Sequence, residues 1–171
     1  PVMQFSDSEE PLAILLVEDN HADARLFQMA LQGGITLAEL TVAGDGESAI
    51  ELLDGHGDRE DPRRPDLVVT DLNMPRRSGH ELIDFIKSHP LLRSVPVVVF
   101  SGSKNPADIE RSYQGGGASY VCKPGDPERF FEVVRTLLAY WSRIARSRRA
   151  ILHGVRGPAL TETPMLTQAL D

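Results

Sequence analysis

The chain has 171 residues, of which 41% are hydrophobic and 25% are charged, and its formal net charge at pH 7 is −7. This length suits one domain with a single sizeable core and tails, and we expect no second domain within these 171 residues. Residues 1–140 carry 13 Lys and Arg against 23 Asp and Glu, so the folded part is expected to bind nucleic acid poorly.

The cysteine content and the apolar segments limit the class of protein further. Cys122 is the only cysteine, which excludes a disulfide framework and a cysteine-based zinc site. We interpret it as a small buried hydrophobe and not as a nucleophile. The one apolar stretch near the N-terminus spans about seven residues, too few for a signal peptide or a membrane span. We therefore expect a soluble protein of a reducing compartment, the cytoplasm.

The first half of the chain predicts a lead-in and two pairs of a strand and a helix. Residues 1–10 are polar and acidic without periodicity, and we expect them to be flexible. Asn20 resembles the cap of a helix that the Gly33-Gly34 pair ends. The predicted elements are a strand over 12–17, a helix over 20–33, an edge-like strand over 37–43 and a helix over 47–54.

The second half continues the same alternation. Its predicted elements are a strand over 67–70, a helix over 79–88, a strand over 97–100, a helix over 106–114, a strand over 119–122 and a long last helix. Asp126 and Pro127 supply the cap and first turn of that last helix. Five alternations with apolar central runs predict an α/β fold, a doubly wound five-stranded parallel sheet with helices on both faces.

Charged and hydroxyl side chains follow the predicted strands at their carboxyl ends. Glu18 and Asp19 follow the first strand, Asp71 the third, Ser101 the fourth and Lys123 the fifth. In parallel sheets these ends meet at one edge, where functional residues gather. Crowded carboxylates require a divalent cation or shifted pKa values to coexist. A lysine beside them indicates that the site handles a further anion, and phosphate is the natural candidate.

Together these residues form motifs, in the expected order, that resemble the receiver domain of response regulators. The motifs are Glu18-Asp19, Asp71-Leu72-Asn73-Met74-Pro75 with Gly79, Ser101-Gly102, and Tyr120-Val121-Cys122-Lys123-Pro124. The resemblance covers residues 11–146 and implies a flavodoxin-like strand order, 2-1-3-4-5. Loop residues such as those at 16–20 and 73–79 are most similar to the stand-alone regulators that partner phytochrome-type sensor histidine kinases.

The resemblance implies a phosphoryl-accepting signalling protein and not an enzyme, with slow self-dephosphorylation. Asp71 would accept a phosphoryl group from a sensor histidine kinase. Asp19, Asp71 and the backbone carbonyl of Asn73 would hold Mg²⁺, while Glu18 would act through a metal-bound water.

The remaining motif residues would respond to the phosphoryl group. Lys123 would pair with one phosphoryl oxygen, and Ser101 would donate a hydrogen bond to another. Movement of Ser101 would open space into which Tyr120 could rotate, carrying the signal to the surface. The bond between Lys123 and Pro124 resembles the cis peptide of the family.

Other functions fit the residues less well. A haloacid-dehalogenase-like phosphatase also uses an Asp nucleophile after a strand with Mg²⁺, but it needs a second Asp where this chain has Asn73. The Gly-rich segment 44–49 matches a dinucleotide-binding pattern, yet it follows the second strand and lacks the acidic residue expected further on.

The last helix carries more apolar surface than packing on a sheet requires. Its apolar residues span an arc of roughly 180°, whereas roughly 100° suffices for a sheet contact. We expect the surplus to form a symmetric homodimer, with Phe131, Leu138, Tyr140 and Trp141 as candidates. A monomer with an unusually apolar helix is the alternative.

A basic and then irregular tail covers residues 147–171. Five arginines follow position 140, at 143, 146, 148, 149 and 156. The tail is too short for a winged-helix output domain, so a transcription factor would lack its DNA-binding half. Salt-dependent nucleic-acid binding through the tail remains the alternative function.

Overall fold

In the computed structural model, the described residues are 11–33, 38–55 and 64–144. They form one five-stranded parallel sheet in the order β2-β1-β3-β4-β5. This is the predicted doubly wound, flavodoxin-like fold, with strand and helix alternating along the chain. The predicted lead-in, 1–10, and tail, 147–171, lie outside the described residues.

The elements follow the sequence pattern closely. The strands are β1 (Leu12–Val17), β2 (Ala38–Ala43), β3 (Leu67–Thr70), β4 (Val97–Ser101) and β5 (Ser119–Cys122). The helices are α1 (His21–Gln32), α2 (Gly46–Asp54), α3 (Gly79–Ser88), α4 (Pro106–Gln114) and α5 (Pro127–Ala139), and α5 continues into a π-helical turn, Tyr140–Ile144. The π-helical turn is the one element that the apolar pattern did not predict.

Side-chain caps begin the helices where the sequence places them. The Asn20 side chain accepts from the amides of Ala22 and Asp23 at the start of α1. Ser78 and Glu81 form a reciprocal capping box at the start of α3. Such caps satisfy amides that have no partner inside the helix. These caps fix where α1 and α3 begin, directly after the loops that follow β1 and β3.

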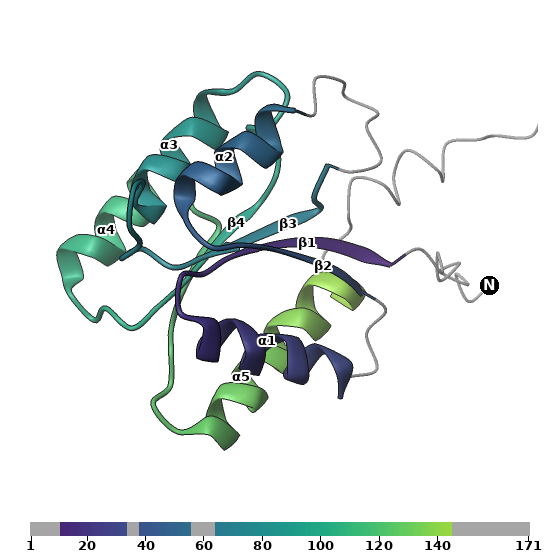
Figure 1. Ribbon diagram of the computed structural model, residues 1–171. Helices are drawn as coiled ribbons and strands as arrows, with labels where there is room; N and C mark the ends of the chain where they lie inside the picture. Colours follow the sequence, from purple (N-terminus) through teal and green to yellow (C-terminus); the bar gives the residue numbers. More distant parts are fainter. Residues whose placement is uncertain (1–10, 34–37, 56–63, 145–171) are drawn as a thin grey trace, which may run out of the picture.

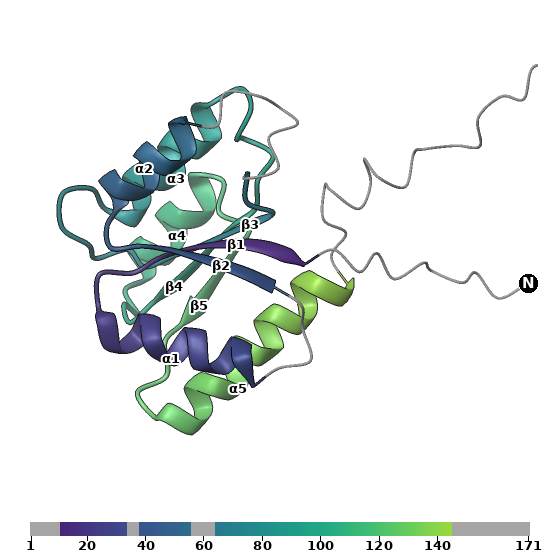
Figure 2. The same ribbon diagram turned by 45° about the vertical axis from the view of Figure 1, so that its right-hand side comes forward.

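Helices cover both faces of the sheet. Figure 1 shows α2, α3 and α4 on one side of the strands and α1 and α5 on the other. Alternate residues of β1 point to different sides, so Leu15 and Val17 join one apolar cluster and Ile14 and Leu16 join the other. Both faces of the central strands are therefore buried, as Figure 2 shows from a second direction.

Aromatic packing holds α1 and α5 against the sheet. The ring of Phe100 on β4 lies edge-on to Phe27 of α1 and to Phe130 of α5, with centroid distances of 6.3 and 5.2 Å. All three side chains are at most 3% exposed. Rings in this geometry add stabilisation beyond their buried area. Within the described ranges, no helix has the length and apolar character needed to cross a membrane.

Two features of the last strand differ from the predictions. Cys122 is exposed, because β5 is an edge strand and Cys122 ends it. The bond between Lys123 and Pro124 is not cis, since the described residues contain no cis peptide. The prediction of a cis bond, made from the family resemblance, is therefore wrong for this structure. The trans isomer is the intrinsically favoured one for a bond preceding proline.

Candidate functional site

The parallel register brings the strand-end residues together. Val17 lies opposite Thr70, so the residues that follow, Glu18 and Asp71, are neighbours across β1 and β3. Ser101 lies opposite Cys122 on the other side, and Lys123 comes next. Backbone hydrogen bonds continue the pairing past the strand ends, from Asp71 N to Val17 O at 3.0 Å and from Lys123 N to Ser101 O at 2.8 Å. The carboxyl edge of the sheet therefore forms one site.

Lys123 is the cation of this site. Its Nζ donates to Glu18 Oε2 at 2.6 Å, to Asp71 Oδ2 at 2.6 Å and to Asp23 Oδ2 at 3.0 Å. The Lys123 side chain is 10% exposed, and Nζ lies 6.0 Å from the ring centroid of Phe100. Burial disfavours the ammonium form, but the hydrogen bonds that Lys123 donates to Asp71 and Glu18 outweigh burial, so the pKa of Lys123 lies well above its usual value. Lys123 is therefore charged over the physiological pH range.

Asp71 has both carboxylate oxygens engaged. Oδ2 accepts from Lys123, and Oδ1 accepts from Ser101 Oγ at 2.6 Å and from Leu72 N at 2.5 Å. Burial alone would raise the pKa of Asp71, yet the hydrogen bonds from Lys123 and Ser101 lower it below its usual value overall. Asp71 is thus an ionised carboxylate held in one orientation, which is the state of a nucleophile.

The carboxyl group of Glu18 lies in a different environment from that of Asp71. Its side chain is 3% exposed, and it accepts from Lys123 and from the amide of Asn20, the latter at 3.1 Å. Burial raises the pKa of Glu18 above its usual value, and the hydrogen bond from Lys123 offsets this only in part. Asp19 is the exposed member of the group. The two adjacent acids therefore present one enclosed and one solvent-facing carboxylate.

The acidic group fits a hard divalent cation. Carboxylate oxygens of Glu18, Asp19 and Asp71 lie within 4.8 Å of one another. An all-oxygen donor set of this kind suits Mg²⁺, which retains several waters and uses one or two carboxylates. Asn73 belongs to the loop after β3, and its amide lies 3.4 Å from Asp71 Oδ1, so its backbone runs beside the phosphoacceptor candidate. The predicted metal ligands are thus brought together, while their role remains a prediction.

Ser101 and Tyr120 connect to a second hydrogen-bonded group on the loop after β4. The Tyr120 hydroxyl donates to Ser103 O at 2.9 Å, and the Ser103 amide donates to Ser101 Oγ at 3.4 Å. The Ser103 hydroxyl in turn donates to Asp108 of α4 at 2.5 Å. Burial raises the pKa of the half-buried Tyr120 hydroxyl. Ser101, Tyr120 and the first turn of α4 are therefore linked through one residue, Ser103.

Three residues, one in the site and two beside it, escaped the sequence analysis. Asp23 is a third acceptor for Lys123. Its position five residues after Glu18, on the first turn of α1, was the available signal. Asp45 and Arg76 form an ion pair beside the site. No spacing rule relates residues 45 and 76, so only the folded chain brings them into contact.

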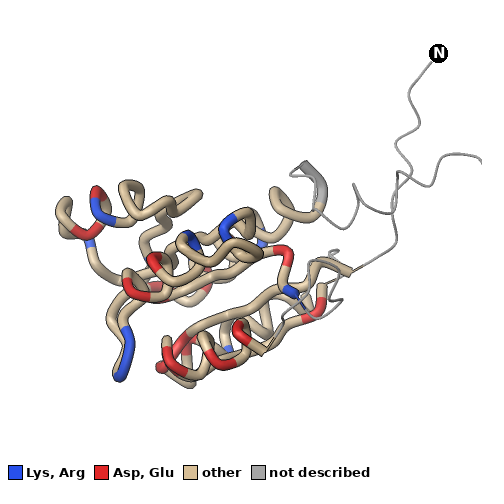
Figure 3. Tube along the Cα trace, turned by 90° about the horizontal axis from the view of Figure 1, so that it is seen from above, with Lys and Arg blue, Asp and Glu red and all other residues tan. Residues whose placement is uncertain are grey.

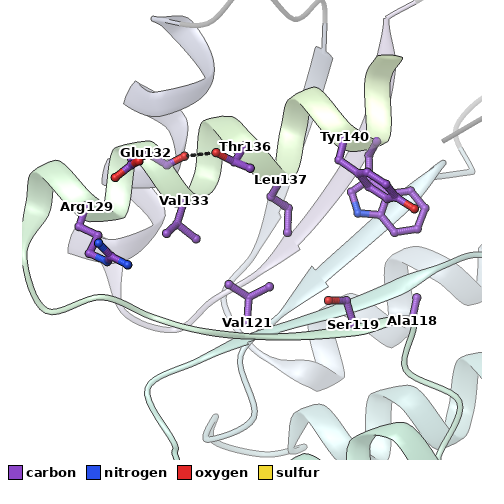
Figure 4. Close-up of a pocket in the computed structure, with 10 residues that line it drawn as sticks. Ala118, Ser119, Val121, Arg129, Glu132, Val133, Thr136, Leu137 and Tyr140 are labelled. Atoms are coloured by element: carbon purple, nitrogen blue, oxygen red, sulfur yellow. Dashed lines mark hydrogen bonds between the residues drawn. The ribbon is translucent and has the colours of Figure 1, made fainter. Parts of the chain in front are cut away.

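A groove lies between the edge strand β5 and helix α5, on a different face from the acidic site. It has a volume of about 570 Å³, and Val121, Val133, Leu137, Tyr140 and Trp141 contribute apolar walls. Figure 4 shows Val133 and Leu137 extending from α5 toward Val121 of β5. Tyr140 is 49% exposed and packs edge-on against Trp141 at 5.3 Å.

The dimer candidates on α5 do not all face this groove. Leu138 is 2% exposed and belongs to the core beneath α5, so it does not lie on a free surface. Phe131 is half-buried against the same core, with the guanidinium of Arg135 5.9 Å from its ring centroid. A wide apolar arc on a helix does not reveal which residues the core already covers. Tyr140 remains as the exposed candidate, and Trp141 beside it is half-buried against the core.

Charges are mixed over the rest of the described surface. Figure 3 shows acidic and basic positions interspersed along the described part of the trace. The arginines at 146, 148, 149 and 156 lie outside the described residues. The predicted basic tail is therefore untested by the structure.

Comparisons with known proteins point to one family. A family model described as the response regulator receiver domain matches residues 14–135. The response regulator Rcp1 of Synechocystis is 36% identical over 135 residues, which cover 79% of this chain and 92% of Rcp1. Among solved structures, the phosphorylated cyanobacterial phytochrome response regulator RcpA is similar, with a TM-score of 0.75 and 37% identity, covering 81% of this chain and 99% of RcpA. The Mn²⁺-bound form of Rcp1 gives a TM-score of 0.74 and 35% identity, covering 80% and 99%.

Proposed function

This chain belongs to the response regulator receiver domain family, and on that premise we propose that it accepts a phosphoryl group onto Asp71 from a sensor histidine kinase. One observation carries the proposal. Asp71, Glu18 and Lys123 meet at the carboxyl edge of the sheet, with Nζ of Lys123 2.6 Å from an oxygen of each acid. An ionised carboxylate next to a fixed ammonium group is suited to receive a phosphoryl group.

The reaction uses Asp71 as the nucleophile. One of its oxygens forms a bond to phosphorus, and the bond from phosphorus to the kinase histidine nitrogen breaks. The depressed pKa of Asp71 keeps the carboxylate ionised for this step. Lys123 would exchange a contact with Asp71 for one with a phosphoryl oxygen, and Ser101 would turn its hydroxyl to another.

A divalent cation is part of the proposal. Asp19, Asp71 and the carbonyl of Asn73 would hold it directly, and Glu18 through water; the clustering of the carboxylate oxygens supports this. The cation supplies positive charge that lets an anionic phosphoryl group approach an acidic site. The Mn²⁺-bound form of Rcp1 supports divalent binding in a relative, and we propose Mg²⁺ for this chain.

The output is a change of surface and not a catalysed reaction. Ser101 donates to Asp71 here, and Tyr120 is held by Ser103. When Ser101 turns to the phosphoryl group, the contacts around Ser103 change, and both Tyr120 and α4 can adopt a second arrangement. The chain would thus act as a signalling protein in the cytoplasm, together with its ATP-using kinase, and lose its phosphoryl group slowly.

We propose a phytochrome-type kinase as the partner. The support is the description of RcpA as a cyanobacterial phytochrome response regulator. RcpA is similar to this chain over 99% of the length of RcpA and 81% of this chain. We also propose a homodimer through the last helix. The exposed Tyr140 and the half-buried Trp141 beside the groove of β5 and α5 support a contact there.

The test is phosphorylation by a small phosphodonor. The full chain incubated with phosphoramidate and Mg²⁺ should gain the mass of one phosphoryl group, and chelation of the cation should prevent the gain. Asp71→Asn keeps the shape of the side chain but not the nucleophile, so this variant should gain nothing. A mass gain that persists in Asp71→Asn would show that another residue is the acceptor.

A further inference from the structure

An ion pair ties the loop after β3 to the start of α2. Arg76, in that loop, contacts the Asp45 carboxylate through Nη2. Asp45 is the N-cap of α2 and is 2% exposed, whereas the Arg76 side chain is 60% exposed. The two residues come from loops that follow different strands, β2 and β3. The contact therefore joins two loops at the functional edge of the sheet.

Capping alone accounts for Asp45 but not for Arg76. As the N-cap, Asp45 accepts two hydrogen bonds from Ser48: the Ser48 amide donates to Oδ1 at 2.8 Å and the Ser48 hydroxyl donates to Oδ2 at 3.1 Å. The cap is therefore formed without Arg76. These bonds hold the carboxylate in one orientation on the end of a helix. Arg76 thus binds an acceptor that is already immobile, which makes Asp45 an anchor for the loop.

The backbone of Arg76 needs such an anchor. Its φ is +65°, and it is the only residue other than glycine with a positive φ in the described part of the chain. Residues with a side chain populate this region sparsely, and the conformation persists when surrounding contacts impose it. The ion pair to Asp45 is one contact that does so.

Close backbone packing supports the same tie. A Cβ on Gly46 would overlap the carbonyl oxygen of Arg77, so the start of α2 and the loop lie in direct contact. At the other end of the loop, the Gly79 amide donates to Leu72 O at 3.0 Å. The loop from Leu72 to Gly79 is thus closed at its base by this bond and held at its tip by Arg76.

Asn73 lies inside this closed loop, between Asp71 and Arg76. We propose that the Asp45–Arg76 ion pair is a positioning contact, which holds the Asn73 carbonyl in place for the divalent cation and so raises metal affinity. This inference rests on the proposed function, which places the cation at Asp19, Asp71 and Asn73. Contacts that orient metal ligands from outside commonly contribute about 10-fold or more to affinity.

Three variants of the full chain test the proposal. Arg76→Ala and Asp45→Asn each remove the ion pair, and Asp45→Asn keeps the oxygen that accepts from Ser48. Arg77→Ala is the matched control, because Arg77 is a neighbouring exposed arginine of the same loop, and its partner is Glu81 in the first turn of α3, at 3.8 Å. Affinity for Mn²⁺ and Mg²⁺ would be measured by calorimetry, and the melting temperature in metal-free buffer.

We expect both Arg76→Ala and Asp45→Asn to bind the metal about 10-fold more weakly than the wild type, and Arg77→Ala to match the wild type. The two substitutions change the net charge in opposite directions, so a shared loss of affinity cannot come from the overall field. The phosphorylation rate at saturating Mg²⁺ should stay within about twofold of the wild type, because the reacting residues are untouched. Arg76→Lys, which retains the charge, should recover part of the affinity.

The outcomes separate this inference from the proposed function. If the wild type binds metal and Asp71→Asn weakens binding, while Arg76→Ala and Asp45→Asn bind like Arg77→Ala, the positioning role is overturned and the proposed site stands. If Asp71→Asn binds metal as well as the wild type, the proposed site itself fails. Should Arg76→Ala fail to fold, Arg76→Lys and Asp45→Asn decide by the same comparison. If the ion pair only stabilises the fold, its loss would lower the melting temperature without changing the metal affinity.

Discussion

At the scale of single residues, the site is a balance of one ammonium group against several carboxylates. Lys123 lies within hydrogen-bond distance of Glu18, Asp23 and Asp71. A bound divalent cation would share some of these oxygens with Lys123. In the proposed function the lysine would therefore have two opposed effects, since it would repel the metal ion and attract the phosphoryl group.

Lys123→Ala should separate these two effects. Removal of a positive charge close to the acidic group should strengthen Mg²⁺ binding by about 1 kcal/mol or more, at least roughly fivefold, because Coulomb's law gives that energy even at the dielectric of water. The same variant should accept phosphate more slowly, by at least about 10-fold, because a phosphoryl oxygen loses its partner. Calorimetry and time-resolved mass measurement would check the two effects, and weaker metal binding would contradict the assignment of Lys123 as a competitor.

Glu18 should lower stability when it is ionised in the absence of metal. Its pKa in the folded chain is raised above the ordinary value of 4.5, chiefly by burial, so the folded state favours the protonated form. Stability contributed by that proton is present at pH values below 4.5 and is lost as the pH rises through the folded pKa.

Glu18→Gln should therefore raise the melting temperature near neutral pH in metal-free buffer, by about 3 °C. The difference should vanish in acid, where both side chains are neutral. Glu51→Gln, at an exposed position on α2, serves as the control and should change little. A lower melting temperature for Glu18→Gln at neutral pH would show that its hydrogen bonds outweigh the cost of burial.

At the scale of elements, the start of α3 is built into the site. A Cβ on Gly79, the first residue of α3, would overlap the carbonyl oxygen of Asp71 and approach Leu72. Backbone, and not a flexible side chain, occupies that space. The helix can approach the loop after β3 this closely only because residue 79 has no side chain.

Gly79→Ala should destabilise the chain by about 2 kcal/mol, although alanine is the better helix former. It should also slow phosphorylation, since relief of the overlap must displace Asp71 or α3. Urea denaturation would measure the first effect and mass gain the second. Gly102→Ala is a matched control, because nothing lies within 4 Å of a Cβ built there. Equal stability of the two variants would contradict the close approach.

At the scale of the whole molecule, the proposed homodimer uses a face away from the acidic site. The apolar groove between β5 and α5 borders Tyr140 and Trp141, whereas Leu138 is covered by the core. A dimer through this face would place β5, which carries Tyr120 and ends next to Lys123, near the partner subunit. Phosphorylation could then change the strength of the dimer.

Tyr140→Glu should convert a dimer to a monomer, since a carboxylate in an apolar contact remains desolvated and unpaired, at a cost of about 2 kcal/mol or more. Sedimentation of the full chain would measure the change. Met29→Glu is the control, because Met29 is 48% exposed on α1, outside the residues that line the groove. A wild-type chain that sediments as a monomer at all accessible concentrations would contradict the proposal.

The fold was predictable because its signals are local. Leu67–Thr70 is a continuous apolar run, and it is the buried strand β3. Asn20, Ser78 and Asp126 precede helices as caps, through bonds that span only a few residues. Two predictions of exposure were wrong: Leu138 is buried and not on a free surface, and Cys122 is exposed and not buried. The apolar pattern of a helix or strand does not indicate which neighbouring elements cover a given side chain.

The amino-acid sequence by itself determined the alternation of strands and helices and the delivery of Glu18, Asp19, Asp71, Ser101 and Lys123 to one edge of the sheet. It could do so because parallel strands with helical crossovers place all their carboxyl ends on the same side. Only the tertiary structure decided how these groups differ. Burial raises the pKa of Glu18, whereas hydrogen bonds from Lys123 and Ser101 lower that of Asp71. The contact of Asp45 with Arg76 likewise exists only in the folded chain. Desolvation and partner choice depend on packing between residues distant along the chain, which no local pattern encodes.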